Sequence, residues 1–142
     1  MEVELHPILD THDLSYLLEI RNDLSTRSQL GNDSTFTLEE CTRWFSTLES
    51  TWYWIVDSNT SNYVGYIRTE GDIIGADIHP DYRRRGYARS AYIKYLEDKN
   101  YASLKVFEDN FAKNLYEDIG FKQSGEFTIV RGRKYLKMVY NK

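Results

Sequence analysis

The sequence has little cysteine and histidine, and each shortage excludes a class of site. Cys41 is the single cysteine among 142 residues, so no disulfide can form within the chain and no cysteine-based metal site is possible. The three histidines, His6, His12 and His79, do not have the spacing of a zinc site, so no bound metal is expected. Cysteine that is this scarce predicts a reducing, cytoplasmic setting.

Long hydrophobic runs and excess positive charge are also missing. No apolar stretch reaches the roughly 18 residues of a membrane span, and none follows a basic N-terminus as in a signal peptide. The net charge is −4 and the isoelectric point about 5.4, whereas nucleic-acid binding favours a basic surface. Nucleic acid and a membrane are therefore not expected as partners.

Only two prolines, Pro7 and Pro80, and no low-complexity linker interrupt the sequence, which predicts one domain over residues 1–142. Alternating and helical spacings of apolar residues predict a mixed α/β fold of about seven strands and four helices. The strands are expected at residues 2–8, 52–57, 63–70, 72–79, 103–107, 121–130 and 133–140. The helices are expected at residues 10–22, 38–48, 85–99 and 111–119.

Local signals refine this outline. Asp10 or Thr11 can cap the first helix, and residues 28–36 are polar and read as a loop. Thr37 and Glu40 form a capping box before a helix whose apolar stripe includes Trp44, which favours the core over a cavity wall for that side chain. Gly75, inside an apolar strand, indicates a bulge or a close approach of other atoms to the backbone.

The stretch "HPDYRRRGYARS", residues 79–90, carries the clearest chemistry. A strand that enters a helix through a short glycine-containing loop leaves free N–H groups at the helix start, and these bind anions. Gly86 lets a phosphate approach the backbone closely, and Ala88 is the next smallest residue on the following turn. Arg83, Arg84 and Arg85 add positive charge around them.

The spacing Arg83-x-x-Gly86-x-Ala88 resembles the R/Q-x-x-G-x-G/A signature of the Gcn5-related N-acetyltransferases, the GNAT superfamily. A second stretch, "LKVFEDNFAKNLYEDIGF", resembles the other signature of that family, on which Tyr116 and Phe121 fall together with Ala112, Leu115 and Gly120. The resemblance implies the GNAT fold, with a central sheet that is splayed at the cofactor strand. It also implies acetyl-CoA as co-substrate, no metal, and direct transfer of acetyl to a primary amine in a ternary complex.

The resemblance also implies roles for individual residues. Tyr116 is expected to be the general acid or, alternatively, only to pack under the cofactor, and Asp72 is a possible base or merely a solvated turn residue. Asp77, His79 and Glu108 are alternatives for the base. Cofactor contacts are expected from Ile78, Arg83, Arg84, Arg85, Gly86, Tyr87, Ala88, Arg89, Asn110 and Tyr116, with Asp109 as an alternative to Asn110.

The acceptor is expected between the N-terminal helices and the closing hairpin, near Arg21, Asn22, Phe36 and Tyr53. A loose resemblance of the N-terminal half suggests an amino sugar, including a nucleotide-linked one, or another small amine. Acetylation of a protein N-terminus and a non-catalytic acyl-CoA-binding module are the alternatives, and the oligomeric state is left as monomer or homodimer. A nucleic-acid site at Arg83–Arg85 is disfavoured by the acidic isoelectric point.

Overall fold

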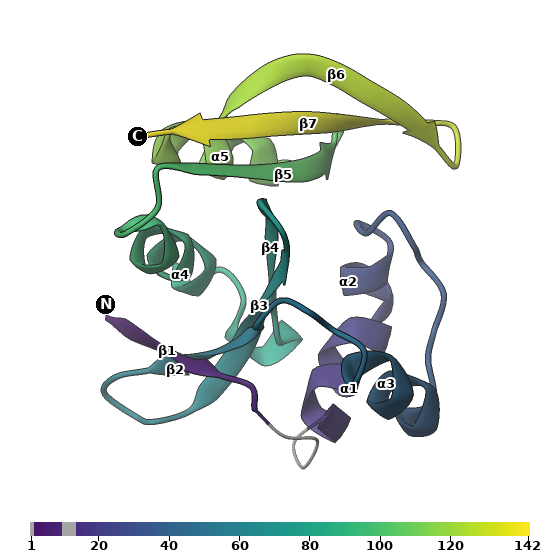
Figure 1. Cartoon of the computed structure of the whole chain (residues 1–142), viewed down its shortest axis with the longest axis vertical. Coiled ribbons are helices and arrows are strands. Elements are labelled where there is room, and N and C mark those ends of the chain that lie inside the picture. The colour runs from purple at the N-terminus through teal and green to yellow at the C-terminus, as the bar shows by residue number, and fades with distance from the viewer. Residues whose placement is uncertain (1, 10–13) are drawn as a thin grey trace.

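A computed structural model describes residues 2–9 and 14–142, which form a seven-stranded mixed sheet with helices on both faces (Figure 1). The strand order is β1-β2-β3-β4-β5-β7-β6, and only β4 and β5 pair in parallel. The predicted α/β class and the seven strands are confirmed. The strands are β1 (Val3–Pro7), β2 (Tyr53–Asp57), β3 (Tyr63–Glu70), β4 (Ile73–Ile78), β5 (Tyr101–Phe107), β6 (Lys122–Val130) and β7 (Arg133–Asn141).

The helices differ in number from the prediction. They are α1 (Leu14–Asn22), α2 (Leu24–Arg27), α3 (Leu38–Phe45), α4 (Tyr87–Leu96) and α5 (Ala112–Ile119), with a 3-10 turn η1 (Pro80–Tyr82). The four-helix prediction missed α2, which is a single turn capped by Asp23 and too short for a periodic pattern. The capping box of Thr37 and Glu40 is confirmed, and the proposed caps Asp10 and Thr11 lie outside the described residues.

Strand alternation separates two cores. Trp54 and Val56 of β2 pack with α1 and α3 on one face, while Ile55 between them packs with α4 on the other. A further core lies under α4 and α5, where Tyr92 and Phe121 meet apolar side chains of β5 and β7. No helix within residues 2–9 and 14–142 is both long and apolar enough to cross a bilayer.

The sheet opens between β4 and β5. The two strands pair only at Ile73 and Ser103, and beyond that point they diverge, which confirms the predicted splay (Figure 1). The predicted bulge at Gly75 is wrong, because β3 and β4 pair in continuous register through it. The register shift in this part of the sheet instead lies in β2, between Ile55 and Val56. The alternative expectation for Gly75, a close approach, is correct: a Cβ there would overlap the guanidinium of Arg68.

Candidate active site

Two cavities meet over the middle of the sheet. One, of about 540 Å³, lies at the opening between β4 and β5 and beside the start of α4; we call it the splay cavity. The other, of about 740 Å³, lies among α1, α3 and the strap, our name for residues 28–36; we call it the helical cavity. Leu30 and Arg68 line both, so the two spaces adjoin at these side chains.

The loop before α4 has an unusual backbone. Arg84 has φ of +62° and Gly86, the residue before the first turn of α4, has φ of +88°. Gly86 has no side chain that could cap the helix, so the first N–H groups of α4 remain available to a ligand. Left-handed residues in such a loop turn the backbone amides toward one concavity, the arrangement that binds phosphate oxygens.

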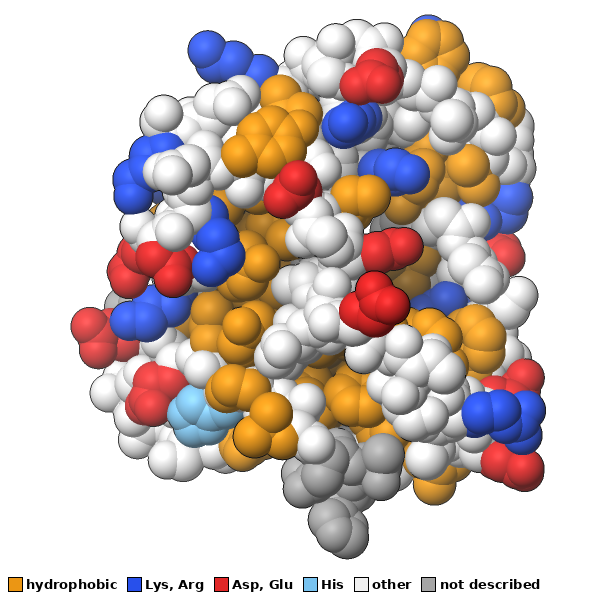
Figure 2. Space-filling view, viewed as in Figure 1, with side chains coloured by type: hydrophobic (Ala, Val, Ile, Leu, Met, Phe, Trp, Pro, Cys, Tyr) orange, Lys and Arg blue, Asp and Glu red, His pale blue; other side chains and the backbone are white. Residues whose placement is uncertain are grey.

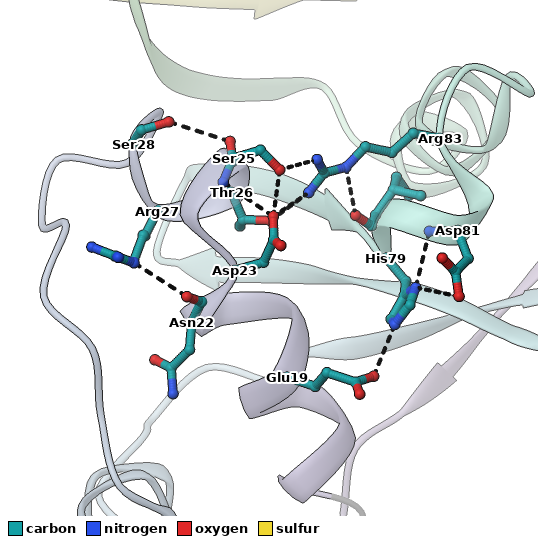
Figure 3. A network of polar contacts seen from close by, with 11 residues as sticks. Glu19, Asn22, Asp23, Ser25, Thr26, Arg27, Ser28, His79, Asp81 and Arg83 are labelled. Atoms are coloured by element: carbon teal, nitrogen blue, oxygen red, sulfur yellow. Dashed lines mark hydrogen bonds and ion pairs between the residues drawn. The ribbon is translucent and has the colours of Figure 1, made fainter.

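Arg83, at the first position of the glycine motif, is anchored within the protein (Figure 3). Its Nε donates to the Ile78 carbonyl at 3.0 Å and its Nη2 donates to Thr26 Oγ1 at 2.6 Å. Its Nη1 donates to the Ser25 hydroxyl, and the Asp23 carboxylate lies 3.5 Å from Nη2. The guanidinium therefore ties the loop to α2, and its main contacts are with the protein.

The ten predicted cofactor residues divide into two groups. Nine of the ten line the splay cavity, and the exception is Arg85, whose guanidinium lies 5.7 Å from the ring centre of Tyr82. Arg89 also lines the cavity and lies 3.9 Å from the Asp118 carboxylate. The Tyr87 hydroxyl is directed away into the core, where it donates to Asp57.

Tyr116 lies in the splay cavity beside a second, more deeply buried tyrosine. Its ring meets that of Tyr92 edge to face, with centroids 5.4 Å apart. Burial raises the pKa of Tyr116, and a hydrogen bond with Tyr92 opposes that rise. The phenol is therefore protonated at neutral pH and has a proton to donate.

Strand geometry identifies the amides that face the opening. Ser103 N–H donates to the Asp72 carbonyl at 2.8 Å, so the even-numbered residues of β4 direct their backbone polar groups toward β5. Ala76 N–H donates to the Tyr92 hydroxyl at 2.9 Å. Ile78 N–H, two residues further on, faces the part of the opening where β5 has diverged.

Asn110 and Asp109, the two candidates for one family position, have separate contacts. Asn110 lines the splay cavity, and its side-chain oxygen accepts from Ala112 N–H at 2.9 Å at the start of α5. Asp109 is ion-paired with Arg133 of β7 at 2.7 Å. The geometry therefore brings Asn110, and not Asp109, to the cavity.

The candidate bases are not brought together. Asp72 is exposed in the turn between β3 and β4, and it lines neither cavity in the described part of the chain. His79 is paired with Glu19 at 2.8 Å (Figure 3), and its ring stacks on that of Tyr16. Of the four residues considered, only Asp77 lines a cavity, and it is paired with Arg68 at 2.9 Å.

The structure brings together only part of the predicted acceptor wall. Arg21 and Phe36 line the helical cavity, and Asn22 holds the Phe36 backbone through bonds to its carbonyl and N–H at 2.8 and 2.9 Å. Tyr53 does not belong there, because strand alternation directs it to α4, where it meets Tyr95. Trp44, expected in the core, is 43% exposed and lines the helical cavity.

Sequence reasoning missed Arg68, which lies where the cavities adjoin. One signal could have found it: a charged residue that directly follows the apolar stretch "YVGYI" within the same strand. Burial disfavours its charge, but the neighbouring Asp77 carboxylate and the surrounding tyrosines together outweigh that cost and raise the pKa of Arg68. The guanidinium is thus a permanent cation at the junction.

Two further observations bear on the classes of ligand. No cluster of three potential metal ligands occurs within residues 2–9 and 14–142. On the face shown in Figure 2, basic side chains are interspersed with acidic ones and do not form a continuous basic stripe.

The sequence comparison agrees with the observed fold. The family model described as "Acetyltransferase (GNAT) domain" matches residues 26–142, which is most of the chain. The chain therefore belongs to the GNAT acetyltransferase family, a family of acyltransferases. No curated protein sequence matches it significantly.

Solved structures with this fold include several acetyltransferases. A variant of the spermidine N-acetyltransferase SpeG of Vibrio cholerae is 17% identical with a TM-score of 0.79, covering 99% of this chain and 94% of its own. The enzyme AAC(6')-Ib, in complex with ribostamycin and coenzyme A, is 18% identical with a TM-score of 0.75, covering 100% and 94%. The protein yncA of Salmonella typhimurium, with acetyl-CoA, is 15% identical with a TM-score of 0.74, covering 99% and 94%.

Proposed function

We propose that residues 1–142 form one N-acetyltransferase domain that transfers acetyl from acetyl-CoA to the primary amine of a small molecule within a ternary complex. One observation carries the proposal: the splay cavity and the helical cavity adjoin, so that two different reactants can meet at their junction. Two of the similar structures hold coenzyme A or acetyl-CoA. Two carry names of amine acceptors or ligands, spermidine and ribostamycin, which supports a small amine here.

The splay cavity fits coenzyme A by its chemistry. A glycine with left-handed backbone begins α4, and backbone N–H groups with arginine side chains are suitable donors for a pyrophosphate. In this proposal the backbone of residues 84–88 binds the pyrophosphate, while Arg84 and Arg89 are near enough to add charge. Arg83 orients the loop through its bonds to α2, and Asn110 lines the same cavity further along.

The chemical step uses positions in the splay. Bound acetyl-CoA supplies a thioester, whose carbonyl needs a hydrogen-bond donor and whose sulfur needs a proton on leaving. Ile78 N–H is the donor that we assign to the carbonyl, because Ala76 N–H is already bonded to Tyr92. Tyr116 is the general acid, since burial keeps its phenol protonated. Asp72 is exposed in a turn outside both cavities and has no part in this scheme.

Ligand binding and turnover test this proposal separately. Acetyl-CoA should raise the melting temperature of the protein, because a ligand that binds only the native state stabilises it in proportion to the logarithm of its concentration over Kd. A screen of amino sugars, polyamines, amino acids and peptides should release free thiol from acetyl-CoA with at least one amine. Stabilisation without any turnover would favour the non-catalytic module, and no stabilisation at about millimolar ligand, far above an ordinary micromolar Kd, would refute the proposal.

A further inference from the structure

Arg68 lies across Gly75 on the face of the sheet that carries α1. Arg68 and Gly75 are directly opposite in the antiparallel register, as are Tyr66 and Asp77, so the four residues share one face. From this position the side chain reaches along β4 and its Nε donates to Asp77 Oδ2 at 2.9 Å. Because any Cβ at Gly75 would overlap the guanidinium, this glycine makes room for the arginine.

The guanidinium uses only part of its donor capacity within the protein. Among residues 2–9 and 14–142, Arg68 makes its side-chain bond through Nε, and Nη1 and Nη2 donate to no protein acceptor. The side chain is 32% exposed while its partner Asp77 is 7% exposed, so the open side of the pair is the arginine side. The Arg68 side chain lines both cavities, so these amino groups are available to a ligand there.

The charges that line the helical cavity divide by depth. Glu40, Arg43 and Glu70 are exposed, whereas Arg21 and Arg68 are half-buried. Glu40 is used in the capping box at Thr37, and Arg43 pairs with Glu39 at 3.1 Å. The two charged side chains that are half-buried in this cavity, Arg21 and Arg68, are both positive.

Arg21 is bonded but not neutralised. It donates to the carbonyls of Asn32 and Ser34 at 2.7 and 3.2 Å, and carbonyls carry no net charge. Burial lowers the pKa of Arg21, Tyr66 and the Asp77 carboxylate oppose this effect in part, and the positive charge of Arg68 adds to it. An anion bound in this cavity would relieve the repulsion between the two arginines.

We propose that the acceptor carries an anionic group, a carboxylate or a phosphoryl group, close to its primary amine, and that Arg68 binds this group through Nη1 and Nη2. The proposal rests on the acetyltransferase function proposed above and names its substrate class. A planar guanidinium with two free amino groups matches the paired oxygens of either anion. Arg68 lies at the junction of the cavities. If the anionic group of the acceptor binds there, its neighbouring amine would lie at the opening between β4 and β5.

Binding of matched amines tests the proposal without requiring turnover. The protein is saturated with coenzyme A, which has no acetyl group to transfer, and each amine is titrated by calorimetry at constant pH and ionic strength. One arm compares phenylalanine with phenylalaninamide and other amino acids with their amides; the second compares glucosamine 6-phosphate with glucosamine and aminoethyl phosphate with ethanolamine. We expect the anionic member of at least one arm to bind about tenfold or more tightly than its neutral partner, as for a charge-assisted hydrogen bond. The arm with the larger ratio identifies the anion.

Three variants assign the preference to Arg68. Arg68→Gln should reduce the ratio of the two affinities to near one. Gly75→Ala adds one methyl group that displaces the guanidinium while retaining its charge, and should reduce the ratio as well. Arg43→Gln removes an exposed arginine of the same cavity that is paired with Glu39, and should keep the wild-type ratio. Melting curves establish that each variant is folded. If Arg68→Gln does not fold, Gly75→Ala tests the role of the guanidinium in its place.

The outcomes separate this proposal from the enzymatic one. Equal binding of anionic and neutral amines in both arms, binding of neither, or a preference that survives in Arg68→Gln and Gly75→Ala would each overturn the role of Arg68. A loss of coenzyme A affinity in Arg68→Gln with an unchanged ratio would overturn it as well. The thiol-release screen independently decides the acetyltransferase function, because acetylation of neutral amines would sustain that function while this proposal fails.

Discussion

At Tyr116 the surroundings decide which form of the phenol is present. Burial raises the pKa of Tyr116 above its ordinary value of about 10, and the bond with Tyr92 opposes only part of this effect. The Tyr92 hydroxyl also accepts a hydrogen bond from Ala76 N–H. Tyr92 therefore links the candidate acid to β4, the strand beside which the thioester carbonyl would lie. Tyr92 and Ala76 thus help to fix the position of Tyr116, although neither belongs to the sequence motif that contains it.

We expect Tyr116→Phe to lower kcat about 100-fold, because general acid catalysis commonly contributes that much or more. Acetyl-CoA affinity should change little, since the ring and its packing are retained. Initial rates and calorimetry with acetyl-CoA measure the two quantities. Tyr140→Phe is the matched control, because Tyr140 packs against the same Phe121 ring, with centroids 5.7 Å apart, and should retain full activity.

The direction of the Tyr116 shift also predicts the pH profile. Activity should rise with pH as the acceptor amine loses its proton, and a raised phenol pKa means that no loss from Tyr116 ionisation begins below about pH 10. Rates measured from about pH 6 to 10 test this. A falling limb near neutral pH that disappears in Tyr116→Phe would contradict the assignment.

The loop before α4 is the element on which the proposed cofactor binding depends. Arg84 and Gly86 both have left-handed backbone, and only a glycine adopts it there without strain. Arg83 ties the loop to α2, a short helix capped by Asp23, which accepts from the Ser25 N–H. The loop thus combines a local requirement, glycine, with a distant one, the polar side chains of α2.

We expect Gly86→Ala to destabilise the fold by about 1–2 kcal/mol and to weaken acetyl-CoA binding tenfold or more. Strain accounts for the first effect, and the added Cβ beside the proposed pyrophosphate accounts for the second. Gly125→Ala separates them, because Gly125 has a similar φ of +92° in β6, with no atom near its missing Cβ, away from either cavity. An equal loss of affinity in both variants would show that strain alone is responsible.

Over the whole molecule, seven buried or half-buried tyrosines have raised pKa values, chiefly through burial. The pKa of Tyr16 rises to about 12, and those of Tyr66 and Tyr92 rise well above 10. The pKa is also raised at Tyr87, Tyr95, Tyr116 and Tyr135. At Tyr87 the main cause is the hydrogen bond to Asp57. These phenols lose protons more readily in the unfolded chain than in the native protein.

We therefore expect the contribution of these tyrosines to stability to be constant below about pH 10 and to fall as pH rises through about 10 to 12. Each tyrosine that ionises only on unfolding adds a slope of about 1.4 kcal/mol per pH unit. Urea unfolding across this range gives the slope, and tyrosinate absorbance should increase together with the loss of tertiary structure. Gradual ionisation of all seven phenols in the folded protein would contradict the expectation.

Local patterns predicted much of the fold and the position of the site. The seven strands follow from alternation, the capping box at Thr37 from two side chains three residues apart, and the glycine loop before α4 from Gly86 at a helix start. Each of these signals depends on neighbours in the chain, so the sequence contains it directly. The bulge at Gly75 was wrong because the reason for that glycine, Arg68, is seven residues away and reaches it only through the register of β3 and β4.

The sequence alone determined the family, the strand pattern and the glycine loop, because backbone conformation and hydrophobic spacing are local properties. Only the tertiary structure decided which side chains share a cavity. It turned Tyr53 toward α4, brought Trp44 to a cavity wall, occupied Arg83 with Ser25 and Thr26, and placed Arg68 between the two cavities. Strand register and packing between distant segments control these contacts, and neither is visible in the spacing of residues along the chain.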